Sequence, residues 1–410
     1  MYTCPVLFIK QIIMCCAKTS ELCIISQDMT VKAFIKKEAV FCCAFAAAAV
    51  SAFFIHPDSE YAGYIDTHVL FILYSLMLVV AGLRSCGVFD SCAAFLCRKM
   101  NTLRSLSTVL VFLCFIFSMF ITNDVSLITF VPFAVLLLER CGKIKYAPYV
   151  IVLQTVAANL GSMLTPMGNP QNLFLYTRMK ISAFDFALIL LHFAAVSAVM
   201  LLLSLLFIPA EKIEQIHEET NSMDDVKKSP AALSVFIILF ALCLCCVFRM
   251  VPAWITASVC FVSVLIIRRR LLLKADYMLL LTFCAFFIFT GNIARIPPVR
   301  NMLEKAVQGH EFYTALAASQ IISNVPAALL LFPFSSDLKE LLLGVDIGGL
   351  GTLVASLASL ISYKLYVNAD IKNSSEKISG LKYLALFTVV NTVFLIVLCV
   401  MREVMRFIKI

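Results

Sequence analysis

Residues 161–172 read GSMLTPMGNPQN and lie inside an uncharged, mostly apolar stretch from Tyr146 to Thr177. The stretch is too long for one straight membrane helix, because about 20 residues cross a hydrocarbon core of about 30 Å. Glycine and proline at its centre interrupt the helix and leave backbone carbonyls and amides without helical partners. In lipid such groups are costly unless protein, water or a bound ion satisfies them. We therefore expect a discontinuous helix that contributes to a binding site.

A second stretch repeats this pattern in the other half of the chain. Residues 346–352 read DIGGLGT, and residues 159–165 read NLGSMLT. Both have a polar residue first, a glycine two positions later and a threonine six positions later. Farther along, Asn169 and Asn172 align with Ser356 and Ser359. Two other apolar stretches, residues 105–138 and 312–336, carry matching polar breaks, Thr122-Asn123 and Ser323-Asn324.

The composition fits a membrane protein throughout the chain. Hydrophobic residues make up 62% of the 410 positions and charged residues 14%, with a mean hydropathy of +0.97. Soluble proteins are about 45–50% apolar and about 25% charged. This excludes a soluble enzyme with a single anchor, and it excludes a disordered chain. The net charge of +8 comes from basic residues in short loops, which indicates membrane topology rather than nucleic-acid binding.

Uncharged runs predict an all-α polytopic protein with nine passes and two re-entrant hairpins. The passes cover residues 39–57, 67–83, 146–177, 186–210, 229–248, 250–267, 277–294, 347–363 together with 341–345, and 383–401. Basic residues at 98–104 and 140–145 flank the stretch 105–138, so both of its ends are expected in the cytoplasm. The short arms of this stretch then form a hairpin with the polar break at its tip. The stretch 312–336 is expected to form the second hairpin, entering from outside.

The expected domain organisation is a pair of inverted repeats. Residues 1–37 form an N-terminal segment, either an interfacial helix or an over-long start before Met29. Residues 38–210 form the first membrane repeat, residues 211–230 a charged cytoplasmic linker, and residues 231–410 the second repeat. The N-terminus is expected inside and the C-terminus outside, in the plasma membrane, although Arg402, Arg406 and Lys409 speak against an outer C-terminus. Inverted repeats with broken helices are typical of secondary transporters.

The motifs resemble those of an ion-transporter superfamily. It includes citrate-transporter-like permeases, arsenite efflux permeases, divalent-anion/sodium symporters and certain sodium/proton antiporters. The similar residues are Thr122-Asn123-Asp124 with Pro132, residues 161–172, Ser323-Asn324-Val325-Pro326-Ala327 and residues 348–352. The resemblance covers about residues 35–405 and implies a homodimer. The dicarboxylate branch carries Ser-Asn-Thr at both tips, so the tips here look nearer to the arsenite-permease and antiporter side.

Asp124 is the most informative candidate, because a carboxylate at membrane depth is costly and usually functional. It would bind Na⁺ or carry a proton, or else cap a helix that begins at Val125. Asp346 would take the place of a cation in the second half, or cap a helix at the interface. Gly161 and Gly348 are expected where each helix leaves helical geometry, so alanine there should favour a continuous helix.

Side-chain oxygens and freed carbonyls are the ligands that a hard cation prefers. The residues Asn123, Gly161, Thr165 and Asn169 are expected to form one cluster, and Ser323, Asn324, Gly348, Thr352 and Ser356 its symmetric partner. The full set of candidate substrate- and ion-binding residues is Thr122, Asn123, Asp124, Asn159, Gly161, Ser162, Thr165, Gly168, Asn169, Asn172, Ser323, Asn324, Asp346, Gly348, Gly349, Thr352 and Ser356.

The predicted function is secondary active transport of an anion or small oxyacid, coupled to Na⁺ or H⁺. The expected partners are this substrate and the lipid bilayer, and no cofactor or resident metal is expected. A sodium/proton antiporter is the alternative. An intramembrane enzyme is a remote one, because Gly161-Ser162 has no credible histidine partner and His192 is expected to serve in helix packing.

Overall fold

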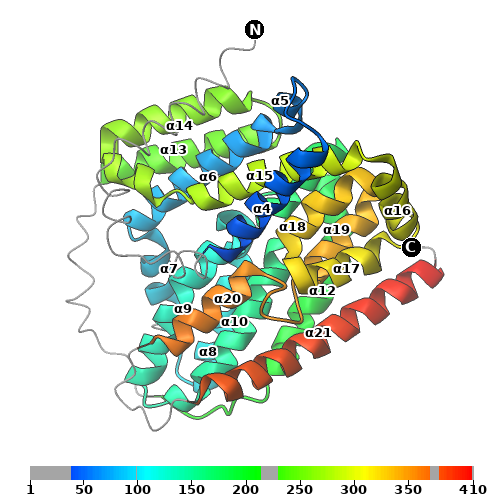
Figure 1. Cartoon of the computed structure of the whole chain (residues 1–410). Coiled ribbons are helices and arrows are strands. Elements are labelled where there is room, and N and C mark those ends of the chain that lie inside the picture. Colours follow the sequence, from blue (N-terminus) through cyan, green and yellow to red (C-terminus); the bar gives the residue numbers. More distant parts are fainter. Residues whose placement is uncertain (1–37, 98, 214–229, 370–377, 409–410) are drawn as a thin grey trace.

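The computed structural model describes residues 38–97, 99–213, 230–369 and 378–408, and every regular element in these ranges is a helix (Figure 1). The predicted segment 1–37 and most of the predicted linker 211–230 lie outside the described residues. Six of the described helices are long and apolar enough to cross a membrane. They are α6 (Thr67–Ser85), α8 (Leu103–Ile121), α12 (Ala183–Leu205), α13 (Pro230–Val247), α15 (Tyr277–Ala294) and α21 (Gly380–Ile408). The chain is an all-α, multi-pass membrane protein, as the sequence predicts.

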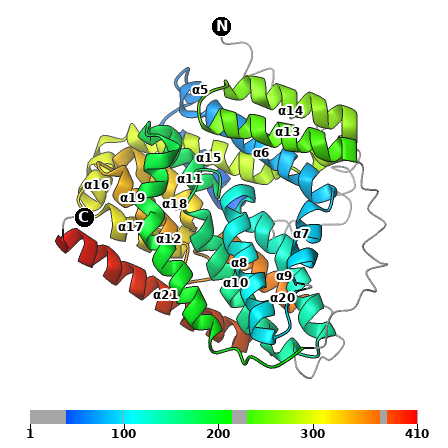
Figure 2. The same cartoon turned by 180° about the vertical axis from the view of Figure 1, so that it is seen from behind.

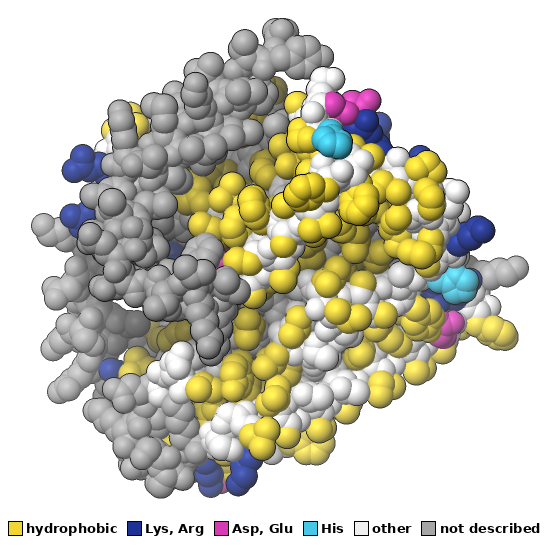
Figure 3. Space-filling model, in the orientation of Figure 1, with side chains coloured by type: hydrophobic (Ala, Val, Ile, Leu, Met, Phe, Trp, Pro, Cys, Tyr) yellow, Lys and Arg dark blue, Asp and Glu magenta, His cyan; other side chains and the backbone are white. Residues whose placement is uncertain are grey.

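Hydrophobic side chains cover much of the outer surface. In Figure 3 they spread over most of the face that is not grey, and charged side chains lie mainly at its edges. Phe53, Phe207 and Phe407 are each at least 80% exposed. Such exposure is expected where lipid, rather than water, surrounds the helices.

The helices form two groups (Figures 1 and 2). The first group consists of α4 (Ala39–Phe54), α6, α13, α14 (Ala253–Arg268) and α15, which pack on one another. The second group contains the remaining long helices from both halves of the chain. In both views α6, α13, α14 and α15 lie in the upper part of the molecule, and in Figure 1 α4 runs from there toward the centre. Helix α6 and the turn η3 (Arg269–Lys274) bring the first group close to the candidate site described below.

The first predicted hairpin is the pair α8 and α9 (Asn123–Arg140). A capping box at Thr102 and Ser105 begins α8. Both ends of the pair meet the start of the linker, because Leu103 N donates to Glu211 O at 2.9 Å and Lys143 forms an ion pair with Glu211. The arms are longer than predicted: the 19 residues of α8 extend about 28 Å, as far as a full pass. That the pair is re-entrant stays a prediction.

The second pair is α17 (Glu311–Ile322) with α18 (Asn324–Leu331), and its arms are short. The Glu311 carboxylate closes the open end of this pair. It accepts hydrogen bonds from the hydroxyl of Ser336 at 2.7 Å and from the backbone N–H groups of Ser336 and Asp337. The two arms therefore return to the same place.

Two interrupted helices follow the pairs. The first consists of α10 (Ala147–Ser162) and α11 (Pro170–Met179), with residues 163–169 as break 1. The second consists of α19 (Leu338–Ile347) and α20 (Leu357–Val367), with residues 348–356 as break 2. Asn169 caps α11 by accepting from Asn172 N, and Pro170 starts that helix. Helices α5 (Tyr61–Tyr64), α7 (Val88–Cys97) and α16 (Pro297–Val307) were not predicted.

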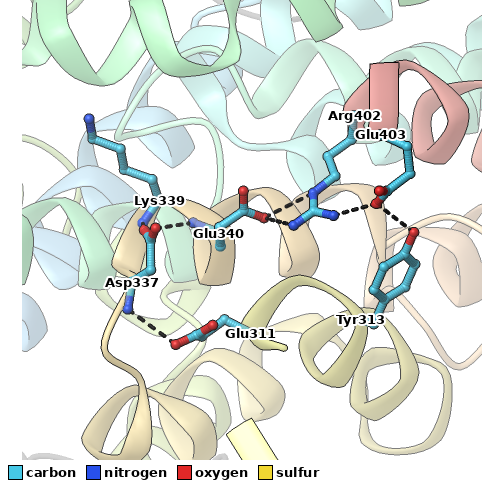
Figure 4. A network of polar contacts seen from close by, with 7 residues as sticks. All are labelled: Glu311, Tyr313, Asp337, Lys339, Glu340, Arg402 and Glu403. Carbon is cyan, nitrogen blue, oxygen red and sulfur yellow. Dashed lines mark hydrogen bonds and ion pairs between the residues drawn. The ribbon is translucent and has the colours of Figure 1, made fainter. Parts of the chain in front are cut away.

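A polar network joins the start of α19 to the last helix, α21 (Figure 4). Arg402 is 6% exposed, and its guanidinium pairs with Glu340 at 2.8 Å and with Glu403. The guanidinium also lies over the rings of Phe312 and Tyr313. Arg402 is therefore neutralised by protein carboxylates, which removes part of the sequence argument against an outer C-terminus.

Candidate functional site

The tips of the two pairs have the same local structure. Thr122 and Ser323 both have φ near 73°, a rare conformation for residues other than glycine. In each pair the following asparagine bonds to the next backbone amide, at 2.9 Å from Asp124 N to Asn123 Oδ1 and at 3.0 Å from Val325 N to Asn324 Oδ1. The two tips are thus built by equivalent residues, as the sequence repeat predicts.

Each tip is attached to the break of its own half. Asn123 N donates to Gly168 O at 3.1 Å, and Asn324 N donates to Ala355 O at 3.0 Å. The aligned threonines repeat the pattern, because Thr165 Oγ1 donates to Met119 O and Thr352 Oγ1 to Gln320 O. Met119 and Gln320 each lie three residues before their tip. These threonines therefore hold tip and break together.

Asn159 connects the first half to the second. Its Oδ1 accepts from Asn123 Nδ2 at 3.1 Å and from Ser356 Oγ at 3.1 Å. Its Nδ2 donates to Gly349 O at 3.4 Å and to Ser359 Oγ at 3.3 Å. A carbonyl oxygen only accepts hydrogen bonds, so the contact with Gly349 O fixes the orientation of the amide. Every polar atom of this side chain has a partner.

Asp346 connects the second half to the first by equivalent hydrogen bonds. Its Oδ1 accepts from Asn169 Nδ2 and from Gln171 Nε2, both at 3.4 Å. The side chain is 3% exposed, and Oδ2 has no hydrogen-bond partner within the described ranges. The predicted cap role of Asp346 is wrong, because it is the next-to-last residue of α19, which Asp337 caps instead.

The carbonyls freed by the breaks are largely bound by protein amides. Asn172 Nδ2 donates to the carbonyls of Ser162, Met163 and Thr165 at 3.0–3.4 Å. Gln320 Nε2 donates to Gly348 O at 2.8 Å and to Leu350 O at 2.9 Å. Of the partners expected for the freed backbone groups, namely protein, water or a bound ion, protein side chains satisfy these five carbonyls.

Gly348 is the C-cap of α19, so that helix ends where the sequence predicts, whereas Gly161 lies inside the last turn of α10. Neither glycine has a positive φ. A Cβ at Gly161 would lie 2.1 Å from Phe115 O, and one at Gly348 would lie 2.5 Å from Gly344 O and 3.0 Å from Leu316 Cα. Both glycines are needed for close packing of the interrupted helices, and each faces the hairpin of its own half.

Asp124 lines a pocket of about 700 Å³ beside the first tip. The helix α9 begins at Asn123, so Asp124 lies in its first turn and does not cap a helix that begins at Val125. The pocket lies between the first group of helices and the first tip. Its polar lining consists of Arg84, Ser85, Thr122, Asp124, Asn169, Lys274 and Asp276, and the rest is apolar apart from backbone. Its volume is typical of small-molecule sites.

The pocket opens where α6 ends, because Arg84, Lys274 and Asp276 are exposed there. The other end of α6, about 27 Å away, is closed by contacts with α11. Arg178 pairs with Asp66 at 2.8 Å and lies over the rings of Phe174 and Phe332. The pocket thus reaches exposed residues at one end of α6, and the other end of α6 is joined to α11 by Arg178 and Asp66.

The structure brings eight of the candidate residues together in hydrogen bonds at the centre. Five of them form the bonds between the halves: Asn159, Asn169, Asp346, Gly349 and Ser356. The other three bond to these residues within the first half: Asn123, Ser162 and Asn172. Thr122 and Asp124 line the pocket beside them. Thr165, Gly168, Ser323, Asn324 and Thr352 shape the tips and breaks, and Thr352 is exposed. That these residues bind substrate or ions stays a prediction.

Four residues that contact the centre, break 2 or the pocket were not among the residues predicted from the sequence. Gln171 and Gln320 bond to the centre and to break 2, and Arg84 and Lys274 line the pocket. Gln171 lies between two residues of the quoted motif, so its position was a usable signal. Gln320 has no polar counterpart, because the equivalent residue is Met119. From the sequence, Arg84 and Lys274 were expected only to mark the cytoplasmic side of the membrane.

A family model described as citrate transporter matches residues 24–362. The inner membrane protein YbiR of Escherichia coli is 30% identical over 308 residues, which cover 73% of this chain and 80% of the relative. An uncharacterized transporter of Methanocaldococcus jannaschii is 31% identical over 303 residues, covering 73% and 81%. A silicon efflux transporter of Oryza sativa subsp. japonica is 33% identical over 134 residues, covering 33% and 27%.

The chain belongs to the citrate transporter family. It is a membrane transporter and not an enzyme, as the sequence predicts.

Proposed function

We propose that this protein is a secondary active transporter that moves an anion or a small oxyacid, coupled to Na⁺ or H⁺. The observation that carries the proposal is the polar centre between the halves, where Asn159 reaches Ser356 and Asp346 reaches Asn169. Buried polar groups at the meeting point of two broken helices are the usual construction of a transporter site. The adjoining pocket gives a substrate access to Asn169.

The two groups of helices suggest how access alternates. Helix α6, η3 and the start of α15 form one wall of the pocket, and the first tip with break 1 forms the other. Movement of the second group of helices relative to the first group would close the pocket and separate Arg178 from Asp66. The substrate would then leave at the other end of α6. In the orientation predicted from the basic loops, the present structure is open to the cytoplasm.

Arg84 and Lys274 in the pocket support an anionic substrate, because two cations at an entrance raise the local concentration of anions. The mostly apolar lining also suits a small oxyacid without charge. The rice relative is named as a silicon efflux transporter, which supports testing a silicon compound as well. The same pocket contains Asp124 and Asp276, which favour the second candidate, a sodium/proton antiporter. For an antiporter, cation exchange would occur without an organic or oxyacid substrate.

Further parts of the proposal are a plasma-membrane location, a cytoplasmic N-terminus, an outer C-terminus and a homodimer. Orientation is tested with single cysteines at Asn101 and Arg140, which are exposed at the two ends of the α8–α9 pair. Both should react with a membrane-impermeant maleimide from the cytoplasmic side only. Labelling from opposite sides would show that the segment crosses the membrane in a single net pass, and it would remove the re-entrant pair.

The function is tested by flux into proteoliposomes that contain the purified full-length protein. The panel consists of citrate, succinate, sulfate, arsenite, silicic acid and ²²Na⁺, each with an imposed Na⁺ gradient, an imposed pH gradient or none. The proposal expects gradient-dependent accumulation of one anion or oxyacid. Transport of ²²Na⁺ against a pH gradient, with no flux of the other compounds, would establish the antiporter instead.

A further inference from the structure

Asp346 has a buried carboxylate oxygen without a partner. It is 3% exposed, and Oδ2 accepts no hydrogen bond from the described residues. Its Oδ1 receives only two long contacts, from Asn169 and Gln171. A carboxylate taken out of water is strongly disfavoured as an anion unless a positive charge or several donors compensate it. The Asp346 carboxylate therefore lacks a positive charge or a hydrogen-bond donor at Oδ2.

A second unpartnered oxygen belongs to a neighbouring side chain. Asn172 is fully buried, and its amide interacts with the Asp346 carboxylate. Three carbonyls accept from its Nδ2, which fixes the orientation of the amide and leaves Oδ1 as the free atom. Oδ1 has no hydrogen-bond partner among the described residues. Two buried oxygens are thus left without a hydrogen or a cation.

The protein itself offers no positive charge to Asp346. Within the described chain no ion pair includes it, and the nearest carboxylate on its own helix, Glu340, lies about 9 Å away along the axis. Arg402 is bound to Glu340 and Glu403 (Figure 4), and Arg178 is bound to Asp66. The titratable side chains on the helices packed against α19 are Tyr149, Tyr176, Arg178, Glu311, Tyr313, Lys382, Tyr383, Cys399, Arg402, Glu403 and Arg406.

The first half shows what completes such a site. Asn159 is the equivalent of Asp346, and Ser359 is the equivalent of Asn172. There, Asn159 Nδ2 donates to Ser359 Oγ at 3.3 Å, so an amide hydrogen lies between the two side chains. In the second half the amide nitrogen is replaced by the carboxylate oxygen Oδ2, which accepts no hydrogen bond from the described residues. The two halves differ by one hydrogen-bond donor at this place.

We propose that Asp346 binds one positive charge, a proton or a sodium ion, at Oδ2 in each transport cycle. The Asn159 amide fills the equivalent place in the first half permanently, so among the described residues the second half alone provides this site. This inference rests on the proposed function and deepens it by assigning the coupling site. The sequence favours Asp124 for that role, but Asp124 lines the pocket and is only half-buried, so water in the pocket can solvate its carboxylate.

Asn169 links this site to the substrate pocket. It lines the pocket, and its Nδ2 donates to Asp346 Oδ1 and to Ser162 Oγ. Its Oδ1 is held by Asn172 N at 2.9 Å, so the amide cannot turn over without losing the cap of α11. A positive charge on Asp346 weakens its attraction for Asn169 Nδ2, which then becomes available to a substrate oxygen. Substrate and cation binding would favour each other through this one side chain.

The test uses purified full-length protein and needs no substrate. The melting temperature is measured in NaCl against choline chloride at constant ionic strength, and over a series of pH values. A ligand that binds only the folded state raises the melting temperature as its concentration exceeds its dissociation constant. The wild type should respond to Na⁺ if sodium is bound, or to falling pH alone if a proton is bound. Asp346→Asn should lose this response, and Asp185→Asn, at the exposed start of α12, should keep it.

An unchanged response in Asp346→Asn, or no difference between the two variants under either titration, would overturn the inference. If Asp346→Asn is not obtained as a monodisperse protein, the wild type is labelled with dicyclohexylcarbodiimide, which modifies protonated carboxyl groups in apolar surroundings. Modification of Asp346, located by mass spectrometry, should become faster at low pH or slower with Na⁺. Absent modification, or a rate independent of both, would overturn it. The proposed function can fail separately, because the substrate panel does not enter this test.

Discussion

Thr122 and Ser323 have nearly the same backbone conformation, with φ 73° and ψ 149° in Thr122 and φ 73° and ψ 155° in Ser323. This region is populated mainly by glycine, because a Cβ crowds the backbone there. Each residue nevertheless carries a side chain, and each forms the tip between two helices. Ser323 Oγ donates to Ala355 O in break 2, and Thr122 lines the pocket, so each side chain has a contact that glycine would not supply.

Thr122→Gly and Ser323→Gly should relieve this strain, which costs about 1–3 kcal/mol at such positions. We expect both variants to melt at the wild-type temperature or higher, and to transport more slowly. The loss should be larger for Thr122, which lines the pocket. Melting temperature and flux are measured on the same preparation. A lower melting temperature with unimpaired flux would show that the tips are purely structural.

Gly161→Ala should destabilise the protein. The new Cβ would lie 2.1 Å from Phe115 O and 2.7 Å from Ser118 Oγ, so α10 must move away from α8. Overpacking of this kind costs about 1–3 kcal/mol. The control is Gly63→Ala in α5, where no atom lies within 4 Å of the added Cβ. Equal melting temperatures for the two variants would contradict the close contact between α8 and α10.

Lys274→Gln tests the sign of the transported charge. Lys274 is exposed at the entrance of the pocket, so its removal should weaken attraction of an anion and raise KM, with little change in the maximal rate. Arg269→Gln is the control, because Arg269 is an exposed cation of the same turn that does not line the pocket. A lower KM in Lys274→Gln would favour a cationic substrate and the antiporter.

Arg402→Gln should lower the stability of the contact between α19 and α21. The variant leaves Glu340 without its partner and removes the stacking on Phe312 and Tyr313. We expect a loss of about 2 kcal/mol, between the values for exposed and for buried ion pairs. Arg300→Gln, which breaks an exposed pair with Glu304, should cost less than about 1 kcal/mol. Similar melting temperatures for the two variants would show that the network in Figure 4 contributes little.

The helices were largely predictable from the sequence. The predicted pass at 277–294 coincides with α15. Break 1 occurs where glycine, proline and asparagine interrupt apolar residues, and break 2 occurs where three glycines do so. Short helices such as α7 and α16 were missed because membrane passes were sought by length alone, and neither has the length of a span. The sequence predicts short arms for the first hairpin, because Thr122-Asn123-Asp124 looks like a polar gap of three residues. Only Thr122 separates the two helices.

Most residues of the site were predictable from the sequence, but the hydrogen bonds that join them were not. Sequence alignment of the halves placed Asn159 opposite Asp346, but it gave each half a separate cluster. The structure connects them crosswise, from Asn159 to Ser356 and from Asp346 to Asn169. Alignment of repeats within one chain does not say how the repeats pack against each other. The pocket could not be predicted either, because Arg84 and Lys274, which both line it, lie 190 positions apart in the sequence.

The most direct measurement compares wild type, Asp124→Asn and Asp346→Asn in proteoliposomes, with the substrate that the panel identifies. Each is assayed for uptake driven by an ion gradient and for exchange of labelled against unlabelled substrate without a gradient. The account predicts that Asp346→Asn exchanges substrate but no longer accumulates it, whereas Asp124→Asn still responds to the gradient. Accumulation by Asp346→Asn at the wild-type level, with the same ion dependence, would contradict the account.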